Sequence, residues 1–155
     1  MSTPNPTQGQ NTSFNPRENG SDYFWYQQRI QAISSAAPTA NAQINLDADS
    51  DFYCVALTSV TDINTAGLGA AYTESTAPLP LVTLLITDTG SGKNLMNGPL
   101  MIPGFTGDGK RPYRFVRPRV FMANATIQLA FSGQFLAAGT SYDIQIIFHG
   151  YKVYR

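Results

Sequence analysis

The sequence predicts an all-β protein, an antiparallel jelly roll or β-sandwich that is preceded by an extended N-terminal arm. Three observations support this fold class. Val, Ile, Thr, Tyr and Phe fill segments in which apolar residues recur at every second position. Gly or Pro stands in nearly every gap between these segments. Finally, no alternation of strand and helix patterns is present, and strand segments joined by turn signals are typical of sandwiches and barrels.

Residues 1–22 form the expected arm, and residues 23–155 form the expected sandwich domain. The arm consists mostly of small and polar residues, and its only sizeable apolar side chains are Met1 and Phe14. Ordering one backbone residue costs about 1–2 kcal/mol, which so polar a segment does not recover by burying itself. We therefore expect a neighbouring molecule to order the arm, with Phe14 and Arg17 as contacts.

The first strands follow directly after the arm. Within residues 23–34, four apolar residues occupy even-numbered positions and so point to the same side of a strand, whereas Trp25 points to the other side. The four are Phe24, Tyr26, Ile30 and Ala32. Residues 42–46 also alternate. Residues 52–60 and 81–87 are continuous apolar runs, which is the pattern of strands covered on both faces.

The second half of the chain predicts three more strands and two long loops. Residues 120–122 and 127–131 indicate two strands that are separated near Asn124. The last strand is the clearest, and its apolar positions are Tyr142, Ile144, Ile146, Phe148, Tyr151, Val153 and Tyr154. Residues 62–80 and 88–118 are rich in small residues, Gly and Pro, so we expect loops that form contact surfaces.

The composition argues against several functions. Only 13% of the residues are charged, well below the roughly 25% that is typical of soluble domains. Ten Lys and Arg balance ten Asp and Glu, so the net charge gives no reason to expect nucleic-acid or anionic-membrane binding. No apolar run reaches the length of a membrane span, and we expect no signal peptide.

The residues that could support catalysis are few. His149 is the only histidine and lies in the final strand, with no nucleophile turn elsewhere in the sequence. Cys54 is the only cysteine and lies in an apolar run, which favours a buried, inert thiol. One Cys and one His cannot close a zinc shell. We expect no enzyme, no metal site and no cofactor.

Two short motifs resemble ligand loops but are incomplete. Asp47, Asp49 and Asp51 alternate as at the start of a calcium loop, yet the Gly and Glu required at its sixth and twelfth positions are missing. Residues 90–94, GSGKN, resemble part of a phosphate loop that lacks its earlier Gly and its final Ser or Thr. We expect a solvated turn at the first and a hairpin tip at the second.

Half of the basic residues lie within residues 110–119, interleaved with Tyr113 and Phe115; they are Lys110, Arg111, Arg114, Arg117 and Arg119. A solvated loop, a protein interface and a nucleic-acid contact all fit this pattern. Arg and Tyr are common in desolvated protein contacts, and the neutral chain lacks the long-range attraction of a polyanion binder. We therefore favour a protein interface; its expected contacts in the domain are Trp25, Tyr26, Arg111, Tyr113, Arg114 and Arg117.

Short motifs along residues 80–155 occur in an order that resembles a known class of proteins. They are Pro80-Leu81-Val82-Thr83, Ile86-Thr87-Asp88-Thr89-Gly90-Ser91-Gly92, Leu95-Met96, Gly107-Asp108-Gly109, Pro112-Tyr113, Pro118-Arg119-Val120-Phe121 and Phe148-x-Gly150-Tyr151-Lys152-Val153. Together with the opening Phe24-Trp25-Tyr26, they resemble small structural proteins of tailed-bacteriophage virions. The similarity is strongest to the jelly-roll cement, or decoration, proteins of podovirus-type capsids.

This resemblance implies a non-enzymatic β-sandwich that is made in the host cytoplasm and attached to the outer surface of the virion. Its partners would be the major capsid protein and further copies of itself, in dimers or trimers, with the arm reaching a neighbouring subunit. Two other functions stay open. One is a receptor- or glycan-binding module of a spike or tail that uses Tyr72, Tyr113 and Tyr154, and the other is a head-completion or connector subunit.

Overall fold

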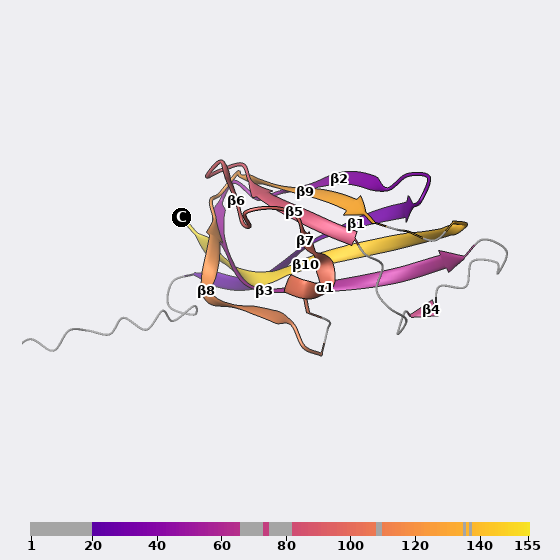
Figure 1. Cartoon of the computed structure of the whole chain (residues 1–155). Coiled ribbons are helices and arrows are strands. Elements are labelled where there is room, and N and C mark those ends of the chain that lie inside the picture. The colour runs from indigo at the N-terminus through magenta and orange to yellow at the C-terminus, as the bar shows by residue number, and fades with distance from the viewer. Residues whose placement is uncertain (1–19, 66–72, 75–81, 108–109, 135, 137) are drawn as a thin grey trace, which may run out of the picture.

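The computed structural model describes residues 20–65, 73–74, 82–107, 110–134, 136 and 138–155 (Figure 1). Nearly all of the regular structure in these residues is β, and it forms two antiparallel sheets that pack face to face. The expected all-β sandwich is therefore confirmed.

We call the two sheets A and B. In sheet A the order is β1-β10-β3, and the far edge of β3 pairs with β8 along one part and with β4 along another. In sheet B the order is β2-β9-β5, and β6 and β7 pair with the far edge of β5. The strands of sheet A are β1 (Ser21–Ser34), β3 (Ser50–Thr65), β4 (Thr73–Glu74), β8 (Tyr113–Phe121) and β10 (Thr140–Tyr154). Those of sheet B are β2 (Thr39–Asn45), β5 (Val82–Asp88), β6 (Lys93–Asn94), β7 (Leu100–Met101) and β9 (Thr126–Gly133), and the short helix α1 (Ile102–Phe105) follows β7.

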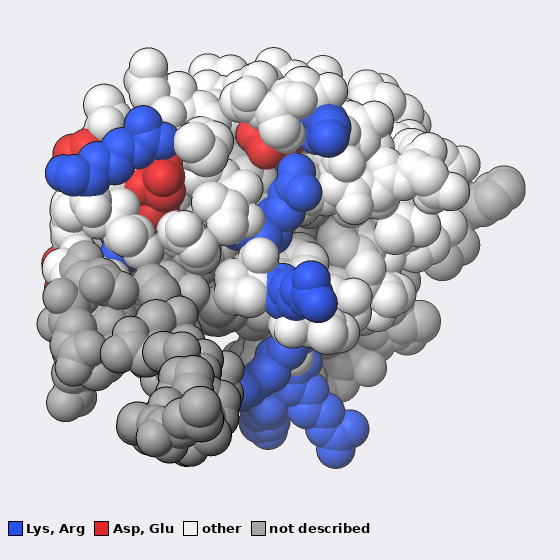
Figure 2. Space-filling model, turned by 90° about the vertical axis from the view of Figure 1, so that its left-hand side faces the viewer, with Lys and Arg blue, Asp and Glu red and all other residues white. Residues whose placement is uncertain are grey.

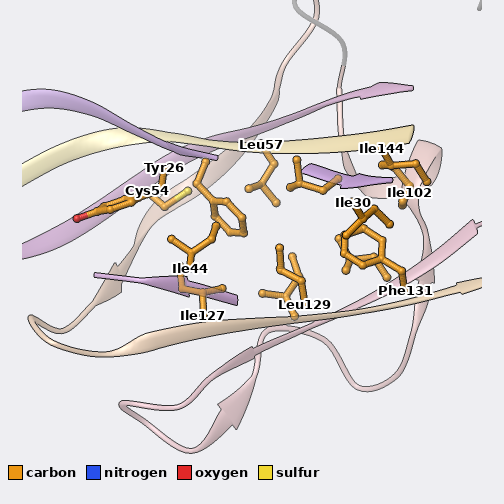
Figure 3. Packing of buried hydrophobic residues seen from close by; sticks show 14 of the residues in the cluster. Tyr26, Ile30, Ile44, Cys54, Leu57, Ile102, Ile127, Leu129, Phe131 and Ile144 are labelled. Carbon is orange, nitrogen blue, oxygen red and sulfur yellow. The ribbon is translucent and has the colours of Figure 1, made fainter. Parts of the chain in front are cut away.

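The hydrophobic core lies between the sheets, where side chains of both inner faces meet (Figure 3). The alternation of each strand produces it, because every second residue points inward. The largest side chains with almost no exposure are Phe52, Phe121, Phe148, Ile33, Leu57, Leu84, Ile86, Ile127, Leu129, Ile144, Ile146 and Val82. Burying one such side chain contributes about 1.5–3 kcal/mol.

One expectation about the first strands is wrong, and a second holds only in part. A bulge in β1 shifts its register against β10 between Ile30 and Ile33, and Ala32 within it has a φ of 58°. Ile33, rather than Ala32, therefore points into the core. The run at residues 52–60 is covered on both faces only in its middle: Ala56, Leu57 and Thr58 are all buried, whereas Tyr53 and Val55 are half-buried and Val60 is exposed on the outer face.

The two expected loops contain regular structure. β3 continues through residue 65, so residues 62–65 belong to a strand. Residues 90–92 form the turn between β5 and β6, which confirms the expected hairpin. The basic segment is not a loop: from Tyr113 onward it forms β8, because it pairs with the edge of β3.

The N-terminal boundary lies close to the expected one. β1 begins at Ser21, so Ser21 and Asp22 belong to a strand that pairs with β10. Phe14 and Arg17 lie outside the described residues. In the part of the chain that the structure describes, no helix combines the length and the apolar character needed to cross a membrane.

Candidate functional site

Aromatic side chains line the outer face of sheet A, the face that points away from sheet B. Residues directly opposite one another in an antiparallel pair point to the same side of the sheet. The register therefore places Tyr23, Tyr151 and Tyr53 in one row across β1, β10 and β3. The rings of Tyr53 and Tyr151 are stacked with centroids 5.3 Å apart, and Tyr23 is 79% exposed.

The adjacent row joins two parts of the chain that the sequence predicted as separate contacts. Trp25 of β1 lies opposite His149 of β10, His149 lies opposite Ala56 of β3, and Ala56 lies opposite Arg114 of β8. Trp25 is 60% exposed, and Arg114 is exposed as well. The aromatic opening of the domain and its basic segment thus contribute to one surface.

β8 bulges away from the sheet in its middle. Arg114 pairs with Ala56 and Arg119 pairs with Cys54, so residues 115–118 stand opposite Val55 alone. Val116 is completely exposed within this bulge, and Arg117 is exposed beside it. A bulge accommodates the missing N–H of a proline, which suits the proline at position 118.

The bulge opens a cavity of about 320 Å³ on the same face. Its lining residues are Val55, Ala56, Pro112, Arg114, Phe115 and His149. Nε2 of His149 lies 2.7 Å from the Thr58 hydroxyl oxygen. Burial lowers the pKa of His149, so its ring is neutral at pH 7. The permanent charge at this cavity is therefore that of Arg114.

The charged residues of β8 and of the segment just before it are all basic. Residues 110–142 contain no Asp or Glu. Arg119 forms an ion pair with Asp88 of β5 at 3.4 Å, whereas Arg114 and Arg117 have no carboxylate partner among the described residues. Figure 2 views the side of the molecule on which β8 lies; Lys and Arg form a line down its middle, and most acidic side chains lie above. On this side, Arg114 and Arg117 are therefore cations with no carboxylate partner among the described residues.

The other predicted contacts occupy different environments. Arg111 is exposed just before β8, and Tyr113 is 46% exposed with its ring edge-on to Phe115 at 5.6 Å. Tyr26 does not suit a contact role: it is 9% exposed, packs in the core, and donates a hydrogen bond from its hydroxyl to Asp47 at 2.9 Å. Tyr26 lies on the side of β1 that faces the core.

The structure describes only some of the tyrosines that the sequence analysis assigned to the alternative function of glycan binding. Tyr154 is half-exposed at the end of β10, and its hydroxyl donates to Asp22 at 3.1 Å. Tyr72 lies outside the described residues. The sequence reasoning missed Tyr23, Tyr151 and Val116 as surface residues; the signal for the first two was their place on the outward parity of alternating strands.

The structure describes Cys54 and the Asp47-Asp49-Asp51 segment, which the sequence analysis considered for catalysis and metal binding. Within them, no group of three or more His, Cys, Asp or Glu is close enough to hold a metal ion. Cys54 is fully buried, and burial raises the pKa of its thiol to about 12. Asp47 and Asp51 are not part of a merely solvated turn, because they form ion pairs with Lys152 and Arg155.

Comparisons with models of protein families, with curated proteins and with solved structures find no match to this chain.

Proposed function

We propose that the protein is a structural component of a phage virion that binds the outside of the capsid and bridges capsid subunits. The observation that carries this proposal is the single exposed face of sheet A on which Trp25 and Arg114 lie in one row. Trp, Tyr and Arg dominate the binding energy of protein interfaces. A face rich in these three residue types fits a protein-binding role better than a solvated one.

We further propose that the sandwich is a jelly roll, a fold common in viral capsid and lectin domains. The strand order supports this. Successive long strands change sheets: β1, β3, β8 and β10 belong to sheet A, while β2, β5 and β9 belong to sheet B. The central pair of each sheet joins a late strand to an early one, β10 to β3 and β9 to β5. Such long-range returns are what two interlocked Greek keys produce.

The distribution of exposed apolar side chains gives this role a preferred face. Among the described residues, the three most exposed large apolar side chains are Val116, Tyr23 and Trp25, all on strands of sheet A, whereas Leu100 and Met101 of β7 in sheet B are 42% and 40% exposed. Exposed apolar side chains gathered on one surface mark interaction sites. Sheet A would therefore face the shell, either within a dimer or trimer or as a single copy.

Counting copies in a purified virion tests the proposal. Quantitative mass spectrometry of virions from a phage that encodes this chain should find it in numbers comparable with the major capsid protein, and imaging should place it on the outer shell. A few copies at one vertex would indicate a connector or spike subunit instead. Absence from the particle would refute the proposal.

A second candidate function is glycan binding, which a feature of sheet B favours. A hollow of about 360 Å³ lies on its outer face, over β2, β5 and β9. The polar residues of its lining are Asn41, Gln43, Thr87 and Gln128. Amides and hydroxyls are suitable partners for sugar hydroxyls. Specific binding of the full chain on a glycan array, lost in Gln43→Ala, would support this function over capsid attachment.

A further inference from the structure

The cavity beside the β8 bulge combines apolar walls with one cation. Val55, Pro112 and Phe115 supply apolar surface, and Arg114 supplies a guanidinium with no carboxylate partner among the described residues. Its volume of about 320 Å³ is at the small end of the range for small-molecule sites, enough for one large side chain and its neighbour.

The cavity is part of the fold rather than a gap between mobile side chains. It lies where residues 115–118 of β8 stand opposite Val55 alone, and Val55 is only half-buried there. The backbone at Gly107 also packs closely against its neighbours. Gly107 hydrogen-bonds to β3 on both of its backbone groups, and a Cβ on it would lie 1.8 Å from the Arg111 carbonyl oxygen. A preformed cavity binds without the cost of ordering its walls.

The charge defines what fits. A guanidinium beside an apolar surface pairs best with a carboxylate, because its planar fork donates two parallel hydrogen bonds. No acidic residue occurs between positions 110 and 142 to compete for Arg114 along its own segment. The neutral net charge of the chain and the apolar walls disfavour a polyanion such as nucleic acid.

We infer that this cavity receives an acidic segment of a partner protein, in which an apolar side chain fills the cavity and a neighbouring carboxylate pairs with Arg114. The inference rests on the proposed function in one respect, because the partner would then be the capsid protein. It assigns the recognition of that partner to a specific site within the outer face of sheet A.

The small molecule 3-phenylpropanoate, a ring joined to a carboxylate, tests the cavity directly, and uncharged 3-phenylpropanamide is its control. We expect 3-phenylpropanoate to shift the amide resonances of Val55, Phe115 and His149 in the full-length chain, with a dissociation constant on the order of 1 mM. We expect the amide to bind at least about tenfold more weakly. A single-stranded oligonucleotide should not shift these resonances.

Arg114→Gln and Arg117→Gln form a matched pair, since Arg117 is exposed on the same bulge but does not line the cavity. Arg114→Gln should abolish the preference for the acid, and Arg117→Gln should retain it. Equal binding of acid and amide, equal losses in the two variants, or displacement of the acid by the oligonucleotide would each overturn the inference. Unchanged melting temperatures of both variants would show that the losses are local.

Incorporation of the same variants into virions separates the inference from the proposed function. If the natural chain is abundant on the shell and Arg114→Gln attaches as well as Arg117→Gln, the cavity does not bind the capsid and the inference fails alone. If the chain is not a shell component but the acid still binds through Arg114, the proposed function fails and the site for an acidic segment stands.

Discussion

The ammonium group of Lys152 lies 3.5 Å from the centroid of the Phe24 ring, at the inner face of sheet A. It also lies 5.4 Å from the ring of Tyr26, and it forms an ion pair with Asp47 in the connection between β2 and β3. Lys152 is buried, whereas the Asp47 side chain is half-exposed. The cluster joins β1, β10 and the β2–β3 connection at one end of the sandwich.

The unequal burial of this pair predicts unequal effects of mutation. Asp47→Asn leaves a buried ammonium group without its counter-charge and should lower the free energy of unfolding by about 2 kcal/mol, since the two rings offset part of the loss. Lys152→Met leaves a carboxylate that water can solvate and keeps the apolar stem, so it should cost less than about 1 kcal/mol. Urea unfolding of both variants checks the order, and a larger loss for Lys152→Met would contradict it.

The same cluster predicts loss of stability at both ends of the pH scale. Hydrogen bonds from Lys152 and Tyr26 hold the pKa of Asp47 below its usual value of 3.8, so its stabilisation is present above 3.8 and is lost as the pH falls below it. Burial alone would lower the pKa of Lys152, but the hydrogen bond to Asp47 and the charges nearby raise it above 10.5. Its stabilisation is complete below 10.5 and is lost as the pH rises further.

Urea titrations from about pH 3 to pH 11 measure this dependence. In Asp47→Asn the acid loss should be shallower, and the alkaline loss should begin at a lower pH because the pKa of Lys152 no longer gains from the carboxylate. Asp51, whose pKa is also lowered because Arg155 and the Ala123 amide outweigh its burial, should keep part of the acid loss in that variant. Identical profiles for the two proteins would exclude the cluster as a source of pH dependence.

Lys152 also shows where sequence reasoning reaches its limit. Strand alternation correctly identified the inward residues of β10 from Ile144 to Phe148, and the same parity points to Lys152. The sequence analysis continued the strand with Tyr151, Val153 and Tyr154 and did not identify Lys152 as buried, because burying a charged residue requires a partner. That partner, Asp47, is distant in the sequence and appeared there only as an incomplete calcium motif. Alternation can be recognised from neighbouring residues, whereas the ion pair that stabilises buried Lys152 joins two residues that are far apart in the sequence.

The backbone at Gly107 passes close to the backbone of residues 111–113, where β8 begins, so we expect a larger residue at this position to destabilise the fold. A Cβ at this position would lie 1.8 Å from the Arg111 carbonyl oxygen and 2.5 Å from the Tyr113 amide nitrogen, and backbone atoms cannot yield as a flexible side chain can. Gly107→Ala should therefore lower the free energy of unfolding by about 1–3 kcal/mol. Gly98→Ala, where an added Cβ meets nothing within 4 Å, is the control and should change it by less than about 0.5 kcal/mol. Similar effects of the two substitutions in urea unfolding would show that the backbone of Gly107 does not lie close to that of Arg111 and Tyr113.

Cys54 should report on unfolding through its reactivity. Its side chain is buried and burial raises the pKa of the thiol to about 12, so the thiolate is scarce at pH 8. We expect the folded chain to react with a disulfide reagent at least roughly a hundredfold more slowly than the chain in concentrated urea. Rapid labelling of the folded chain, followed by absorbance, would show that β3 is accessible or opens readily.

The candidate site was only partly predictable. Trp25 and the residues around Arg114 were identified from their types, yet nothing in the sequence places residues 25 and 114 on one row; β10 and β3, which lie between them, do so. Tyr26 was included because it adjoins Trp25, and its inward parity excludes it from the surface. The bulge of β8 falls in the segment that was predicted to be a loop, since Gly and Pro recur throughout residues 88–118.

Trp25 provides the test of the outer face of sheet A as a whole. Trp25→Ala should weaken attachment to purified capsids by about tenfold or more, because an aromatic anchor at the centre of an interface carries much of its energy. Leu100→Ala is a matched control, as Leu100 is a similarly exposed apolar residue on the edge of sheet B. Neither substitution removes a core contact, so both should leave the free energy of unfolding within about 0.5 kcal/mol of the natural chain. Weakened attachment for Leu100→Ala with none for Trp25→Ala would assign docking to the β7 edge of sheet B, rather than to the face of sheet A that carries Arg114.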